Sequence, residues 1–205
     1  MAEITHIVMD IEGTVAPISF VHEKMFPYVR NNLNEYLTKT WSSELTQGDI
    51  QALIAQSQVD EKEKFPSITY ITLPITTEQN ILQPQIVANV LSQMDIDRKI
   101  GALKQLQGHI WKEAFDSRAL VAELFSDVYP ALKRWSAQKK HLSIYSSGSI
   151  SAQKLLFGHT QDGDLLSYLE AHFDTTSGHK REVKSYETIC GQLQVAPEQC
   201  LFLTD

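Results

Sequence analysis

Cysteine and long apolar runs are scarce in this sequence of 205 residues. Its two cysteines, Cys190 and Cys200, are too few for a disulfide scaffold and lack the spacing of a zinc site. Nowhere do about 18 apolar residues follow one another, and no basic leader precedes an apolar core, so the sequence predicts neither a transmembrane helix nor a signal peptide. These absences favour a protein of the reducing cytoplasm.

An excess of positive charge is also missing. The chain has 18 lysine and arginine residues against 25 aspartate and glutamate residues, a formal net charge of -7. This balance opposes non-specific attraction to nucleic acid or to an anionic membrane. We therefore expect a small molecule as the partner, without nucleic acid or a membrane, and an anionic substrate would need a locally positive pocket. We also expect a monomer. The 42% of hydrophobic residues suffices for a buried core.

Three short apolar runs organise the chain, and each ends at small or acidic polar residues: 4–9, 142–145 and 200–203. Each run predicts a buried parallel strand. Helical patterns at 151–157 and 185–193 lie between the second and third runs, as expected of strand-helix-strand units with right-handed crossovers. The sequence therefore predicts an α/β fold with a Rossmann-like parallel sheet.

The long stretch between the first two runs has a helical pattern instead. Apolar residues recur at spacings of three and four, as in the set Phe26, Val29, Leu33, Tyr36 and Leu37. We expect a mainly helical cap inserted at 21–125, with the core formed by 1–20 and 126–205. The segment 65–74 breaks the helical period with β-branched residues and two prolines, which predicts a loop or a short edge strand.

The first strand ends on two acids and a turn, Asp10-Ile11-Glu12-Gly13-Thr14. Asp10 is placed to attack a phosphorus atom, and Glu12 to manage the proton of a leaving group. An acid before a glycine is also common in a plain turn or helix cap. The later strand ends therefore decide between these two explanations.

Polar residues at the other strand ends are expected to converge on Asp10, because ligands of open α/β sheets bind beyond the carboxyl ends of the strands. Ser146 and Ser147 open a helix and suit an anion site, although a serine there can simply cap the helix. Lys180 could neutralise a phosphate, or be merely solvated. Asp205 could complete a Mg²⁺ site with Asp10, or be a charged chain end.

The ordered set Asp10-x-Glu12-Gly13-Thr14, Ser147, Lys180 and Asp205 resembles the four motifs of the haloacid dehalogenase superfamily. Most phosphatases of that superfamily carry aspartate where this chain has Glu12. Within the superfamily, the chain resembles enolase-phosphatase, also called acireductone synthase. The segments that carry this resemblance include Leu103-Lys104-Gln105-Leu106-Gln107-Gly108-His109-Ile110-Trp111, Tyr145-Ser146-Ser147-Gly148-Ser149, His172-Phe173-Asp174-Thr175 and Leu201-Phe202-Leu203-Thr204-Asp205.

This resemblance implies a Mg²⁺-dependent phosphoric monoester hydrolase of methionine salvage. Such an enzyme enolises 2,3-diketo-5-methylthiopentyl-1-phosphate. It then hydrolyses the phosphate through an aspartyl-phosphate and releases the acireductone 1,2-dihydroxy-3-keto-5-methylthiopentene. The fold implied is a haloacid dehalogenase-like core with an inserted cap.

The resemblance also implies roles for individual residues. Asp10 would be the nucleophile and Glu12 the proton carrier. The metal-associated acids would be Asp10, Glu12 and Asp205. The substrate-binding residues would be Ser146, Ser147 and Lys180. Lys184 competes with Lys180 for the place beside the phosphate.

Two residues of the expected cap combine a titratable ring with an apolar one. His109 and Trp111 could contact the methylthio end or the carbonyls of the substrate. The alternative is packing in the interior of a cap helix, which is the usual role of a tryptophan.

The family continues beyond the strand that precedes Asp205, with a further helix, strand and tail. The resemblance therefore implies that the C-terminal core elements are truncated here, with apolar surface and an open sheet edge at 200–203. Two alternatives to enolase-phosphatase stay open. One is a generic small-molecule phosphatase of the same superfamily, and the other is an inactive, truncated interaction protein.

Overall fold

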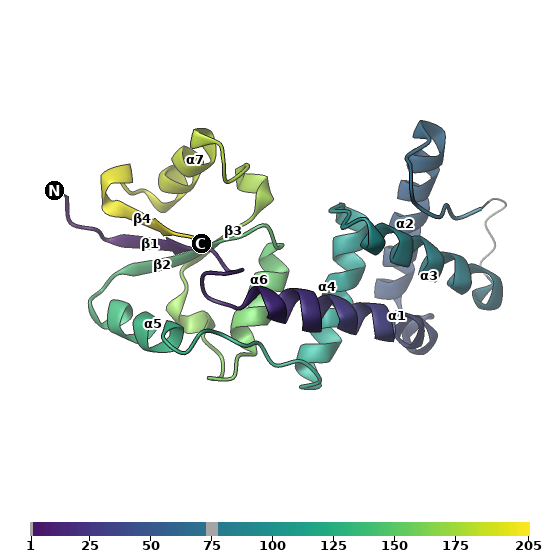
Figure 1. Ribbon diagram of the computed structural model, residues 1–205, viewed down its shortest axis with the longest axis horizontal. Coiled ribbons are helices and arrows are strands. Elements are labelled where there is room, and N and C mark those ends of the chain that lie inside the picture. Colours follow the sequence, from purple (N-terminus) through teal and green to yellow (C-terminus); the bar gives the residue numbers. More distant parts are fainter. Residues whose placement is uncertain (1, 73–77) are drawn as a thin grey trace. The chain divides into compact units, whose positions relative to one another are not determined.

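The computed structural model describes residues 2–72 and 78–205 (Figure 1). The chain divides into two compact units. The core unit combines the segment up to Met25 with the segment from Ala114 onward, and the helical unit is Phe26–Glu113. The two units are described separately below.

The core unit is built on a sheet of four parallel strands in the order β3-β2-β1-β4. Their bounds are His6–Met9 for β1, His141–Tyr145 for β2, Ala171–Phe173 for β3 and Cys200–Leu203 for β4. The predicted α/β fold with a parallel sheet is confirmed. Strand β3 was not predicted, because three residues at a sheet edge are too few to give a period in the sequence.

Helices cover both faces of this sheet. Figure 1 shows α7 over one face, with α5 and α6 over the other. On the α7 side, Val8, Tyr145, Phe173 and Ile189 form a buried cluster. The helices of the core unit are η1 (Phe20–Met25), α5 (Val128–Ala137), α6 (Ile150–Gly158), η2 (Leu166–Tyr168), η3 (Thr175–Ser177), α7 (Val183–Leu193) and η4 (Pro197–Gln199).

The strand register sets which residues meet at the carboxyl edge of the sheet. Met9 pairs with Ile144 of β2 and with Leu203 of β4. The residues that follow each of these partners therefore emerge at the same edge. Segments nearly 200 residues apart in sequence are brought together there by a parallel ladder.

The helical unit contains α1 (Phe26–Thr40), α2 (Glu44–Glu63), α3 (Gln79–Asp95) and most of α4 (Gly101–Asp116). The predicted helical period is confirmed in α1, where Val29, Leu33, Tyr36 and Leu37 are all buried. Helix α2 begins at an N-cap, since Ser43 Oγ accepts a hydrogen bond of 3.1 Å from Thr46 N.

Residues 65–72 have no regular secondary structure, and the last two residues of the predicted loop or edge strand, Leu73 and Pro74, lie outside the described residues. Side chains of two helices hold the described part. Ser57 Oγ accepts a hydrogen bond from Ile71 N at 2.8 Å, and Asn89 Nδ2 donates one to Thr69 O at 2.6 Å. These bonds satisfy backbone groups that no strand partner takes up.

The helical unit is shorter at both ends than the insert expected at 21–125. Hydrogen bonds tie the chain after α4 to the core unit: Phe125 N donates to Val15 O at 3.0 Å, and Ala122 N to His159 O at 2.8 Å. Residues before α1, including η1, belong to the core unit as well.

Candidate active site at the carboxyl edge of the sheet

Asp10 lies directly after β1 and is 6% exposed. Its backbone N–H donates a hydrogen bond of 2.9 Å to Leu203 O, which fixes the residue to the end of β4. Its Oδ1 accepts a bond of 2.7 Å from Ile11 N, and its Oδ2 forms an ion pair with Lys180 Nζ. Thr204 Oγ1 also donates to Oδ2, at 3.4 Å. A buried carboxylate is thus paired with a cation that is partly open to solvent.

The turn after Asp10 requires a glycine. Gly13 has a φ of +77°, which disfavours any side chain, and a Cβ there would lie 2.7 Å from Oδ2 of Asp205. Four backbone hydrogen bonds close this turn, three of them to Ile11 O. The turn therefore brings the chain after Asp10 against the Asp205 carboxylate.

The three predicted metal-associated acids do not gather into one cluster of carboxylates. Within residues 2–72 and 78–205, no three histidine, cysteine, aspartate or glutamate side chains form a group that could hold a metal ion. Asp10 lies at the strand end and Asp205 lies against Gly13, whereas Glu12 is half-buried in the turn. The direction of a side chain inside such a turn depends on its backbone angles, which the spacing of the acids does not encode.

The loop after β2 carries the two predicted serines. Ser146 is buried, its backbone N–H donates to Phe173 O at 3.1 Å, and its Oγ accepts from Gly148 N at 3.3 Å. Ser147 is exposed. The cap of α6 is instead Ser149, whose Oγ accepts from Ala152 N at 3.3 Å. The capping explanation therefore applies to Ser149, and not to Ser146 or Ser147.

Gln153 holds this loop, and sequence reasoning missed it. Its side chain is buried, and its Nε2 donates to Gly148 O at 2.9 Å and to Phe173 O at 2.8 Å. Its Oε1 lies 3.2 Å from Nδ1 of His172, whose pKa is lowered by burial and further by the charge of Lys154. The available signal was an amide on the otherwise apolar face of α6.

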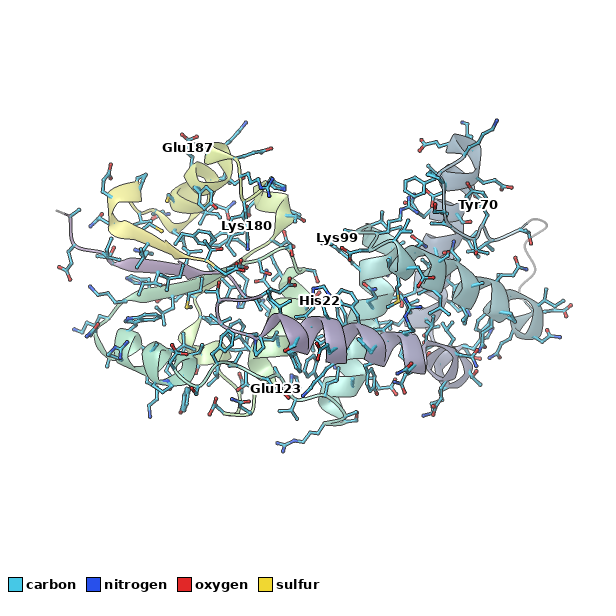
Figure 2. All side chains as sticks on the ribbon, in the orientation of Figure 1. His22, Tyr70, Lys99, Glu123, Lys180 and Glu187 are labelled. Atoms are coloured by element: carbon cyan, nitrogen blue, oxygen red, sulfur yellow. The ribbon has the colours of Figure 1, made fainter. Side chains whose placement is uncertain are left out.

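Lys180 lies in the irregular segment that precedes α7, in the core unit (Figure 2). Its Nζ is the atom that reaches Asp10. Lys184, the competing lysine, is exposed in the first turn of α7. The geometry thus favours Lys180 as the cation beside the candidate nucleophile.

His109 and Trp111 belong to the helical unit and have local partners. Trp111 is buried and packs edge-to-face on Phe26, with ring centroids 5.5 Å apart. Nδ1 of His109 lies 2.7 Å from Oδ2 of Asp49, a carboxylate that is fully buried and also accepts from Gln105 at 2.7 Å. These contacts support the packing explanation for Trp111 and give His109 a buried acceptor.

The described part of the chain has no helix that is both long and apolar enough to span a membrane.

Comparisons with known proteins identify the family of this chain. The family model for haloacid dehalogenase-like hydrolases matches residues 4–205. Enolase-phosphatase E1 of Xenopus tropicalis is 46% identical over 203 residues, which are 98% of this chain and 78% of that protein. The solved structure of the UTR4 protein from Saccharomyces cerevisiae superposes with a TM-score of 0.73 at 34% identity, covering 98% of this chain and 80% of that one.

One plant relative is a much longer protein than this chain. The probable bifunctional methylthioribulose-1-phosphate dehydratase/enolase-phosphatase E1 of Oryza sativa subsp. indica is 48% identical over 200 residues. These residues are 97% of this chain but 38% of that protein. The chain therefore belongs to the haloacid dehalogenase-like hydrolases and, within them, to the enolase-phosphatase E1 family.

Proposed function

We propose that the chain is an enolase-phosphatase of methionine salvage. Its substrate would be 2,3-diketo-5-methylthiopentyl-1-phosphate, which it enolises and then dephosphorylates to the acireductone 1,2-dihydroxy-3-keto-5-methylthiopentene. The observation that carries this proposal is the buried Asp10 carboxylate paired with Lys180 at the carboxyl edge of the sheet, in a chain 46% identical to an enolase-phosphatase E1.

Asp10 acts as the nucleophile of the phosphatase step. One carboxylate oxygen attacks the phosphorus atom in line with the ester oxygen, a bond forms between Asp10 and phosphorus, and the phosphorus-ester oxygen bond breaks. Glu12 donates a proton to the departing oxygen. Water then attacks the aspartyl-phosphate, Glu12 takes its proton back from that water, and inorganic phosphate leaves.

Lys180 and the serine loop bind the phosphoryl group. The Asp10 carboxylate and the phosphoryl oxygens are both negative and repel each other, and the ammonium of Lys180 reduces this repulsion. Ser146 and Ser147 provide hydroxyl and backbone donors next to the start of α6. In a protein with a net charge of -7, an anionic substrate requires a cation at the site, and Lys180 supplies one.

The donor atoms at this edge fit a Mg²⁺ ion. Asp10 and Asp205 supply carboxylate oxygens, which this hard cation prefers, and the missing Cβ of Gly13 leaves the space into which Asp205 projects. Asp10 and Asp205 would therefore hold the ion, with Glu12 as the third acid associated with it. When bound, Mg²⁺ supplies positive charge that reduces repulsion between the nucleophile and the phosphoryl oxygens.

The helical unit would act as the cap that selects the substrate. It is a separate compact unit inserted between β1 and β2, the arrangement expected of a module whose surface can vary without disturbing the sheet. We further expect the chain to work as a cytoplasmic monomer on a small phosphorylated diketone.

The test supplies the diketo phosphate with Mg²⁺ and follows enol absorbance and phosphate release in the same sample. We expect the enol to appear first and phosphate to follow. A panel of sugar phosphates and other esters is assayed in parallel. Faster turnover of a sugar phosphate would favour a generic phosphatase, and no phosphate release from any ester would contradict the proposed function.

A further inference from the structure

The segment that carries Lys180 is held by side-chain hydroxyls and not by a helix or strand. The carbonyls of residues 178–180 each accept a hydrogen bond from a different hydroxyl. The donors are Tyr145, Ser185 and Tyr186, at 2.9, 2.8 and 2.7 Å respectively. Tyr186 donates to the carbonyl of Lys180 itself. Three consecutive backbone groups are therefore fixed between β2 and α7.

The two tyrosines also form part of an aromatic platform with Phe202 of β4. The ring centroids lie 5.9 Å apart for Tyr145 and Tyr186, 5.9 Å for Tyr145 and Phe202, and 5.4 Å for Tyr186 and Phe202. The Nζ of Lys180 lies 5.9 Å from the centroids of both Tyr145 and Phe202, within the range of a cation-π contact. The platform thus contacts both the backbone and the ammonium of Lys180.

Gly178 makes the close approach to α7 possible. Its φ is +118°, and a Cβ at this position would lie 2.1 Å from Ser185 Oγ. Real Cβ atoms do not come this close, so the segment could not pack on α7 in this way with any other residue at 178. The glycine, the hydroxyls and the rings all restrict residues 178–182, the connection between η3 and α7.

We propose that Tyr186 is a positioning residue for Lys180, whose backbone it holds so that the ammonium meets Asp10. This inference rests on the proposed function, because it takes Lys180 as the group that neutralises the phosphate. A lysine side chain has several rotatable bonds, and fixing its backbone reduces the freedom that it loses when it pairs with Asp10 and the phosphoryl group. The Tyr186 hydroxyl bonds to a backbone carbonyl, so it acts through Lys180 and not on the reacting atoms.

The experiment is a double-mutant cycle on phosphate release. Tyr186→Phe removes the hydroxyl and keeps the ring, and we expect kcat/KM to fall about three- to tenfold, the effect of one lost hydrogen bond. In a Lys180→Ala background the same change should have no further effect, because there is no ammonium left to position. A purely structural role would reduce activity by the same factor in both backgrounds.

Tyr168→Phe is the matched control. The Tyr168 ring also packs edge-to-face on another tyrosine, Tyr129, with ring centroids 6.2 Å apart, in the core unit but outside this site. We expect its kcat/KM to stay at the wild-type value. Should Tyr186→Phe fail to fold, Tyr145→Phe frees the Gly178 carbonyl instead and should give a smaller loss with the same dependence on Lys180.

Binding of inorganic phosphate, measured by calorimetry, separates this inference from the proposed function because it needs no turnover. We expect Tyr186→Phe to weaken it by a similar factor. Equal binding and turnover in wild type and Tyr186→Phe would overturn the positioning role alone. A wild-type chain that neither binds phosphate nor hydrolyses any ester would instead contradict the proposed function, and the phosphate role of Lys180 with it.

Discussion

Each unit pairs a buried aspartate with a basic side chain, but the two basic side chains differ in their exposure to solvent. In the helical unit, Arg98 and Asp60 form a two-point ion pair at 2.6 and 2.7 Å, with side chains only 10% and 2% exposed. In the core unit, Lys180 pairs with Asp10 but keeps 29% of its side chain exposed. The Arg98–Asp60 pair is enclosed and stabilises the helical unit, whereas the ammonium of the Lys180–Asp10 pair stays accessible to a ligand.

Uncharged side chains hold the loops around the Lys180–Asp10 pair. Neutral groups hold the two loops beside Asp10, namely the amide of Gln153 and the hydroxyls of Tyr145, Ser185 and Tyr186. Neutral donors fix a backbone without adding a second charge beside the reacting groups. Lys180 therefore remains the positive charge next to Asp10. The predictions below test whether the two kinds of charge pair really have separate purposes.

The largest effect is expected from Asp10→Asn. The amide has nearly the shape of the carboxylate but is a far weaker nucleophile, so phosphate release should fall by about 10⁴-fold. Single-turnover phosphate assays measure this loss, and thermal unfolding of the same variant should show a folded protein. Near-normal turnover would remove Asp10 as the nucleophile and with it the main difference between the two pairs.

Arg98→Met tests the enclosed ion pair of the helical unit. It leaves the buried Asp60 carboxylate without its partner, so the free energy of unfolding should fall by about 3–5 kcal/mol. Urea unfolding measures it. The control is Arg30→Met, which removes an exposed ion pair with Asp95 in the same unit and should change stability by less than about 1 kcal/mol. Equal losses in the two variants would show that burial of the Arg98 pair is unimportant.

Much of this architecture could be predicted from sequence, because strands and helices follow from local periodicity. An apolar run ending on Asp10, and parallel strands whose carboxyl ends converge, were sufficient to bring Asp205 to the same edge. Lys180 follows a strand that the sequence did not predict, and its role was implied by the resemblance to the superfamily. The helical insert followed from its spacing of three and four. These features depend on residues close together in the chain.

What could not be predicted depends on contacts between distant residues. The bond from Tyr186 to the Lys180 carbonyl and the double donation by Gln153 exist only once β2, β3 and α7 are packed. The direction of the Glu12 side chain is a further example, since it depends on the turn that backbone hydrogen bonds form after Asp10. Residue type and spacing carry no information on such angles.

Gln153→Leu should have the next largest effect on stability. Leucine fills a similar volume but removes the side-chain donor of the Gly148 carbonyl and one of the two donors of the Phe173 carbonyl, which costs about 1–3 kcal/mol. The serine loop should loosen too, and phosphate release should fall. Gln161→Leu, at an exposed position with a single bond to Leu124 O, is the control and should stay within about 0.5 kcal/mol of wild type. A loss no larger than that of the control would contradict the role of Gln153.

Acid should weaken the two units in different pH ranges. Burial lowers the pKa of His172, so its stabilising neutral form is fully present above the unfolded value of about 6.5 and is lost as the pH falls through the folded value. The hydrogen bond from Arg98 lowers the pKa of Asp60, so that contribution holds down to about pH 4 and is lost only below it.

Unfolding curves across pH 3–8 measure these contributions. Each group gives a slope of at most about 1.4 kcal/mol per pH unit. We expect His172→Gln to flatten the upper range and Asp60→Asn to flatten the lower one. An unchanged slope below the unfolded pKa of about 6.5 in His172→Gln would show that another group weakens the core unit there.

The smallest effect is expected from Ser143→Ala, and the informative result is whether the free energy of unfolding rises or falls. Ser143 is 1% exposed in the middle of β2, and its Oγ has no hydrogen-bond partner among the described residues. Removing an unsatisfied buried hydroxyl should raise the free energy of unfolding by up to about 1 kcal/mol. Ser57→Ala in the helical unit is the matched control, because Ser57 is equally buried but accepts the bond from Ile71 N, so the same substitution should destabilise that unit. Destabilisation by both changes would show that Ser143 has a partner, and that the core unit satisfies its buried polar groups as fully as the helical unit does.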